Sequence, residues 1–70
     1  MNTRQKLVEI EQLRQNKRQG ILKRYPDSKS PVRYQWRVHT CMWANFQQGG
    51  GLYGLDEDAL NKTLKFFRSI

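Results

Sequence analysis

The 70-residue chain carries 13 Lys and Arg residues against 6 Asp and Glu residues, a formal net charge of +7, and only 37% hydrophobic residues. A domain this short buries only about 60% of the surface of its unfolded chain, and one cysteine cannot close an internal disulfide. The longest apolar run, Cys41 to Ala44, is far below the roughly 20 residues of a membrane-spanning helix. An unpaired thiol and the lack of a secretory signal pattern predict a cytoplasmic protein that does not enter a membrane.

The positive charge is concentrated in the first 30 residues, which hold eight Lys and Arg against three Asp and Glu. A positive potential of this size steers a protein towards nucleic acid, anionic lipid or an acidic protein surface. We therefore expect function to depend on an anionic partner.

Residues 2–19 are rich in good helix formers, with Asn2 or Thr3 placed to cap a helix that Gly20 would end. Because helices in proteins are stabilised mainly by packing an amphipathic face, a helix with a narrow apolar stripe buries little. We expect this one to be loosely docked or partly disordered when the protein is free. Its stripe, about two turns long, consists of Leu7, Val8, Ile10 and Leu13.

The composition divides the chain into three parts. Residues 1–25 are predicted to form a basic, helical or flexible arm, and residues 26–31 a linker with two prolines and polar turn formers. Residues 32–70 are predicted to form the compact core, built from a helix, a glycine-rich turn and a second helix.

The segment 32–46 is compatible with two secondary structures. Its even positions are mostly apolar and its odd positions mostly polar, as in a half-buried strand, but an unbroken strand of that length would far exceed the usual ~5 or 6 residues. The helical interpretation has explicit ends, with Ser30 as N-cap, Pro31 at the first helical position and Gly49 as C-cap. Helix is therefore favoured. The aromatic residues expected in the core are Trp36, Trp43 and Phe46.

A second helix is predicted to follow the glycines at 49–51. Asp56 can cap it, Leu55 and Leu60 occupy the positions of a hydrophobic staple, and acidic residues lie at the positive end of its dipole. The predicted fold class is a small all-α unit of two or three helices with a basic, partly disordered N-terminal arm; the alternative is an α+β fold with a strand at 32–46. The core face of the second helix has the spacing i, i+4, i+7: Leu60, Leu64 and Phe67.

Two patterns that suggest chemistry are better explained as structure. Gly49, Gly51 and Gly54 match a dinucleotide-binding fingerprint, but the chain is too short for the βαβ unit, and the acids that follow would repel a pyrophosphate. His39 and Cys41 point away from each other on a helix, and together they are too few ligands for structural zinc. We expect no enzyme activity, no cofactor and no metal.

The chain length, the basic arm with its segment from Lys6 to Ile10, and the Trp-, Cys- and Met-rich core resemble the small early proteins that lytic phages use to bind and redirect host RNA polymerase. The likeness covers the whole chain and is closest to regulators that act at both initiation and termination. The resemblance implies a non-enzymatic transcription regulator that inhibits initiation and promotes antitermination through protein contacts. It transfers no functional residue to this chain.

The expected partner-binding surface combines the apolar stripe with neighbouring cations, which suit an acidic groove on bacterial RNA polymerase or on another acidic protein. The alternative is direct binding of DNA or RNA through the same cations. We expect a monomer in either case. The candidate site residues are Arg4, Lys6, Leu7, Val8, Ile10, Leu13, Arg14, Arg33 and Arg37.

Overall fold

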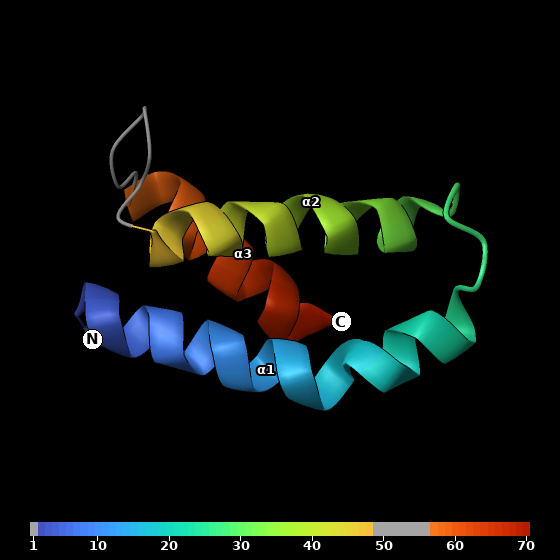
Figure 1. Cartoon of the computed structure of the whole chain (residues 1–70), viewed down its shortest axis with the longest axis horizontal. Helices are drawn as coiled ribbons and strands as arrows, with labels where there is room; N and C mark the ends of the chain where they lie inside the picture. Colours follow the sequence, from blue (N-terminus) through green and yellow to red (C-terminus); the bar gives the residue numbers. More distant parts are fainter. Residues whose placement is uncertain (1, 49–56) are drawn as a thin grey trace.

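The computed structural model describes residues 2–48 and 57–70, which form three helices. Helix α1 spans Thr3–Arg24, α2 spans Pro31–Gln47 and α3 spans Glu57–Ser69. Helices α1 and α2 run side by side, and α3 crosses between them on one face (Figure 1). The all-α prediction is confirmed, and the alternative strand at 32–46 is wrong because α2 covers that whole segment.

Helix α1 begins as predicted and ends later. The Gln5 amide donates to Asn2 Oδ1 at 2.8 Å, while the Asn2 amide donates to Gln5 Oε1 at 3.0 Å, which completes a capping box. Gly20 does not end the helix, which continues to Arg24. Glycine inside a helix costs only about 1 kcal/mol relative to alanine, and burial of Ile21 in the next turn, at 3% exposure, offsets that cost.

Helix α2 starts at the predicted Pro31, after a turn in the linker. The Lys29 amide donates to Asp27 Oδ1 at 2.9 Å, and the Ser30 amide donates to the Asp27 carbonyl at 3.0 Å. The Ser30 side chain makes no capping hydrogen bond, although its carbonyl accepts from the Tyr34 amide at 2.8 Å. The turn therefore reverses the chain and lays α2 antiparallel to α1.

Several predicted features lie outside the described residues. These are the C-cap at Gly49, the glycine-rich turn and its nucleotide-like fingerprint, the cap at Asp56 and the staple at Leu55. The description of α3 begins at Glu57, with Glu57 and Asp58 in its first turn as expected for the positive end of the helix dipole.

All three helices contribute to one hydrophobic core. Phe67 is fully buried and packs its ring edge to face with Trp36, with the centroids 5.1 Å apart and the planes at 88°. Trp43 is half-buried and packs against the same core. The predicted core residues of α2 and α3 are thus confirmed in place. The buried hydrophobic residues are Ile10, Ile21, Trp36, Phe46, Leu60, Leu64 and Phe67.

The packing of α1 differs from the predicted separate arm at residues 1–25, because α1 forms one wall of the core. Ile10 has no exposed surface, and Leu7 and Leu13 pack against the same cluster. The narrow stripe is enough to dock α1 because α2 and α3 together offer it an apolar surface. The α1 sequence alone does not show that surface. Partial disorder of this segment in the free protein stays a prediction.

Polar contacts hold α1 against both ends of α3. Lys6 Nζ lies 3.2 Å from Glu57 Oε2, and Thr3 donates a hydrogen bond to the same carboxylate. These hydrogen bonds, from Thr3 and then Lys6, lower the pKa of Glu57. Lys17 Nζ donates to the carbonyls of Phe67 at 2.7 Å and Arg68 at 3.2 Å, so that an α1 lysine satisfies the C-terminal end of α3.

A second ion pair crosses the same interface. Arg68 Nη2 donates to Glu9 Oε1 at 2.8 Å. This hydrogen bonding lowers the pKa of Glu9 and raises the pKa of Arg68.

His39 joins α2 to α3. Its Nδ1 shares a hydrogen bond of 2.9 Å with Oγ1 of the buried Thr63, and its ring stacks on Phe66 with a centroid distance of 4.5 Å. Burial lowers the pKa of His39 because the charged form loses solvation. His39 thus serves the helix interface, whereas Cys41 is exposed.

Candidate functional site

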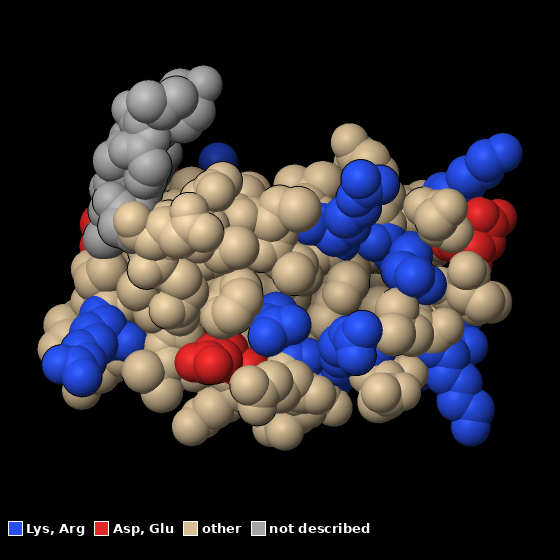
Figure 2. Space-filling view, in the orientation of Figure 1, with Lys and Arg blue, Asp and Glu red and all other residues tan. Residues whose placement is uncertain are grey.

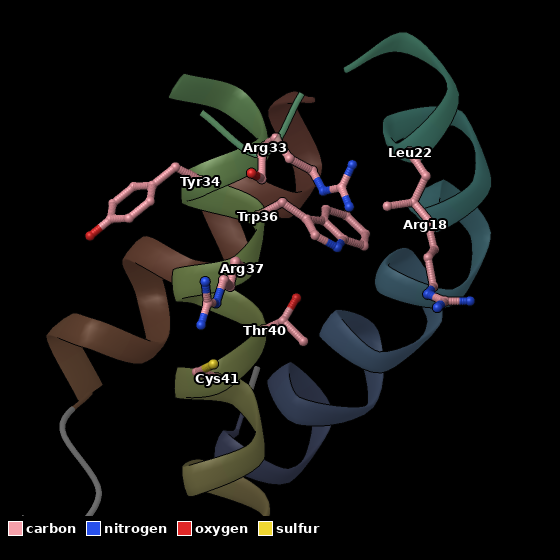
Figure 3. A pocket seen from close by; sticks show the side chains of 9 residues that line it. Arg18, Leu22, Arg33, Tyr34, Trp36, Arg37, Thr40 and Cys41 are labelled. Carbon is pink, nitrogen blue, oxygen red and sulfur yellow. The ribbon is translucent and has the colours of Figure 1, made fainter. Parts of the chain in front are cut away.

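A groove with a volume of about 360 Å³ lies between α1 and α2 (Figure 3). Helix α1 contributes one wall with Arg18 and Leu22, and α2 contributes the other. The two helices meet there because the turn at 25–30 is short and α2 is antiparallel to α1. The lining residues are Arg18, Leu22, Ser28, Arg33, Tyr34, Trp36, Arg37, Thr40 and Cys41.

Three arginines converge on this groove. Arg33 Nη1 donates to the Tyr25 carbonyl at 2.9 Å, which fixes the side chain at the closed end of the helix pair. Arg18 and Arg37 are exposed and, in the described part of the chain, have neither an ion pair nor a hydrogen bond. None of the described residues that line the groove is acidic. The groove is therefore a site of concentrated, unneutralised positive charge.

Helical spacing explains how these side chains come together. On α2, residue 37 lies about one turn after residue 33, and residues 40 and 41 lie about one turn after residue 37, so they follow one face of the helix. On α1, residues 14, 18 and 22 are spaced i, i+4, i+8 and face that line from the other side. Figure 2 shows the result on the surface, where Lys and Arg side chains gather over the half of the molecule near the connection between α1 and α2.

The inner side of the groove offers a polar group beside an apolar wall. The Oγ1 atom of Thr40 is buried and has no hydrogen-bond partner in the described part of the chain. Trp36, only 6% exposed, lines the same groove about one turn earlier on α2. A hydroxyl group can donate to an acceptor on a bound ligand, and leaving it unpaired costs about 1–3 kcal/mol.

Beyond the groove, α1 and α2 are joined by a cation–π contact. The Arg14 guanidinium carbon lies 4.3 Å from the ring centroid of Trp43. Arg14 Nε and Trp43 Nε1 are buried and also lack partners among the described residues. This arginine thus packs within the fold.

Two side chains at the groove rim face solvent. Tyr34 is 56% exposed, and in Figure 3 its ring projects from α2 on the side away from α1. Cys41 lies two turns along the same helix and carries an exposed free thiol. Arg37 lies between them on α2 (Figure 3).

The structure separates the predicted apolar stripe from the predicted cations. Ile10 is in the core with Leu7 and Leu13 packed against it, so of the stripe only Val8, at 47% exposure, presents a large exposed surface. Val8 and the exposed Arg4 border a small hollow on the outer face of α1.

The predicted cations have different environments. Lys6 is paired with Glu57, and Arg14 lies over Trp43. Arg33 and Arg37 are brought together in the groove. The predicted site residues therefore do not form one continuous surface, and only two of the nine line the groove.

Arg18 was missing from the predicted site. Its signal was present in the spacing of Arg14, Arg18 and Leu22, which places them on one face of α1. That signal becomes useful only when this face is known to lie opposite Arg33 and Arg37.

No family model, curated protein or solved structure matches the chain. The resemblance to phage proteins that bind RNA polymerase therefore stays a prediction. None of the described helices combines the length and apolar character needed to cross a membrane. Within residues 2–48 and 57–70, no group of three or more His, Cys, Asp or Glu side chains is arranged to hold a metal ion.

Proposed function

We propose that this protein is a non-enzymatic nucleic-acid-binding protein whose groove between α1 and α2 contacts the phosphate backbone. The observation that carries the proposal is the convergence of Arg18, Arg33 and Arg37 on a groove whose described lining contains no acid. The net charge of +7 adds a long-range attraction to any polyanion.

The chemistry of arginine supports phosphate as the ligand group. A guanidinium presents five N–H donors in a planar fork that matches phosphate oxygens and forms charge-assisted hydrogen bonds. Arg18 and Arg37 have these donors free of internal ion pairs among the described residues. Like charges in one groove also repel each other, so a bound phosphate relieves a cost already present in the free protein.

The groove is arranged for binding rather than for a reaction. Its described lining offers arginines, hydroxyl groups and one thiol, but no carboxylate or imidazole that would serve as a general base. His39 is committed to Thr63 and Phe66 at the other interface of α2. We place the protein in the cytoplasm, where the exposed Cys41 thiol would remain reduced.

Direct binding measurements test this proposal. Fluorescently labelled DNA and RNA oligonucleotides should bind the full chain at low salt, and the logarithm of the binding constant should fall linearly with the logarithm of salt concentration. The slope counts the phosphates that the protein neutralises. If neither single-stranded nor duplex oligonucleotides bind above background at low salt, the proposal is wrong.

A second candidate function is regulation of transcription by contact with bacterial RNA polymerase. One observation favours it: Val8, at 47% exposure, lies with Arg4 at a hollow on the outer face of α1, a small apolar patch beside a cation. Such a patch suits an acidic protein surface with an apolar centre.

Affinity capture tests the second candidate. The immobilised chain should recover RNA polymerase subunits from a nuclease-treated bacterial lysate, and a Val8→Asp variant should not. Nuclease treatment removes polymerase held through nucleic acid. Recovery of no subunit by the unmodified chain would exclude this function.

A further inference from the structure

We propose that the groove selects single-stranded nucleic acid, with one base stacked on Tyr34 and the flanking phosphates held by the groove arginines. This inference rests on the proposed nucleic-acid binding and adds the class of strand and the residue that recognises it. It assigns a role to Tyr34, which, among the described residues that line the groove, is the aromatic side chain outside the core.

The environment of Tyr34 differs from that of the buried aromatic residues that the structure describes. Trp36, Phe46 and Phe67 are buried, whereas Tyr34 is 56% exposed. Among the described residues its ring takes part in neither an aromatic pair nor a cation–π contact. The ring is therefore more than half exposed and has no aromatic or cationic partner among the described residues, which leaves ring surface for stacking a base.

The arginines are placed to hold phosphates next to such a base. Arg37 follows Tyr34 by three residues, about one helical turn or ~5 Å along the axis, and Arg33 precedes it directly. In Figure 3, Arg37 lies in front of α2, and the Arg18 side chain extends along α1 on the opposite wall of the groove. A strand that follows the exposed side of α2 would thus meet the Tyr34 ring and then the Arg37 guanidinium.

The unpartnered Thr40 hydroxyl lies on the inner side of this arrangement. Thr40 lies three residues beyond Arg37 on the same face of α2, and its buried Oγ1 has no acceptor or donor partner in the described part of the chain. In Figure 3 the hydroxyl faces α1, so it belongs to the inner wall of the groove, behind the exposed Arg37.

The position of α2 argues against duplex as the preferred ligand. A recognition helix must project so that it can enter a major groove of about 12 Å width. Helix α2 instead packs against α1 along one side and α3 along another, and its arginines lie in a recess between helices. A flexible single strand can follow that recess, and only an unpaired strand offers a free base face to Tyr34.

Two substitutions at Tyr34 test the stacking. The probes are oligouridylate and oligothymidylate of about 12 nucleotides, within the ~4–16 nucleotides of known single-strand sites, and a blunt duplex of equal length. Single strands should bind more tightly than the duplex. Tyr34→Leu should weaken single-strand binding about 5- to 150-fold, as expected for losing one stacked base, whereas Tyr34→Phe should stay within about twofold because the ring face remains.

The unique exposed cysteine reports where the strand lies. Cys41 lines the groove, so a bound strand should slow its alkylation in the unmodified protein. Matched thermal unfolding curves show that both Tyr34 variants are folded, because an exposed side chain contributes little to stability.

The outcomes separate this inference from the proposed function. Absence of all nucleic-acid binding overturns both. Duplex binding as tight as single-strand binding, equal affinities of Tyr34→Leu and Tyr34→Phe, or alkylation of Cys41 unaffected by a saturating strand overturns the inference, while salt-dependent binding in any of these cases leaves the proposed function intact.

Discussion

The two interfaces of α1 use positive charge in opposite ways. Towards α3, the cations are neutralised within the fold: Lys6 faces Glu57, Arg68 of α3 binds Glu9, and Lys17 caps the carbonyls at the end of α3. Towards α2, Arg18 and Arg37 face a groove with no acid among its described lining residues.

This difference shows that net charge alone does not identify a binding surface. Cations next to carboxylates or helix C-terminal carbonyls stabilise the fold and are not available to a partner. Cations gathered without counter-charges destabilise the free protein slightly and favour an anionic ligand. The packing of the three helices therefore divides the cations into those with partners inside the fold and those that line the groove without a counter-charge among the described residues.

The largest expected effect is on stability, and it tests whether α1 belongs to the core. Ile10→Ala should lower the free energy of unfolding by about 2–5 kcal/mol, because the side chain is completely buried. Urea denaturation followed by circular dichroism measures this loss. The exposed neighbour provides the control, since Val8→Ala should change stability by less than about 0.5 kcal/mol. An unchanged unfolding curve for Ile10→Ala would restore the interpretation of α1 as a separate arm.

The next effect compares cations on the two interfaces. Replacing both Arg18 and Arg37 by Gln should weaken binding of single-stranded nucleic acid at least about 10-fold and reduce the salt slope by about 1.4 if each contacts one phosphate. Replacing both Lys6 and Arg68 by Gln removes the same charge from the α3 side and should leave the salt slope nearly unchanged. Equal slopes for the two double variants would contradict the division of roles.

A smaller effect concerns the cap that α1 supplies to α3. Lys17→Met keeps the length of the side chain but removes the donor to the Phe67 and Arg68 carbonyls, and should cost roughly 1.5 kcal/mol. Thermal unfolding measures the loss, with Lys65→Met on the exposed face of α3 as a control of equal charge. If both variants unfold at the same temperature, the Lys17 contacts contribute nothing to stability.

The smallest effect is a pH dependence at the interface of α2 with α3. Burial lowers the pKa of His39 in the folded protein, so the unfolded chain binds its proton more readily. The neutral, partly buried His39 ring therefore contributes its full stability above its ordinary pKa of about 6.5. This contribution is lost as the pH falls through the lower pKa that His39 has in the folded protein. The Tm should therefore fall modestly between pH 7.5 and 5.5, and His39→Asn should remove this slope.

The effect of His39 can be distinguished from that of the α1 ion pairs because the two occur at different pH. The pKa values of Glu9 and Glu57 are also lowered, but these carboxylates lose their contribution only below their ordinary value of 4.5. A Tm that stays constant down to pH 5 would show that protonation of His39 has no cost in the fold.

Much of the helical architecture is predictable because its signals are local. Asn2 as a cap, Pro31 at the first helical position and the spacing of Leu60, Leu64 and Phe67 each depend on residues within a few turns, and all are observed. Gly20 shows the limit of such signals. The helix continues through it because Ile21 is buried by contacts from other helices.

The sequence by itself determined the helical class, the positions of α2 and α3, the aromatic core and the excess of positive charge. Only the tertiary structure decided that the stripe around Ile10 is core, that Lys6 is neutralised and that Arg18 lies opposite Arg37. The physical reason is that propensity, capping and periodicity act within one helix, whereas the partner of each helix face depends on how distant helices are aligned against one another.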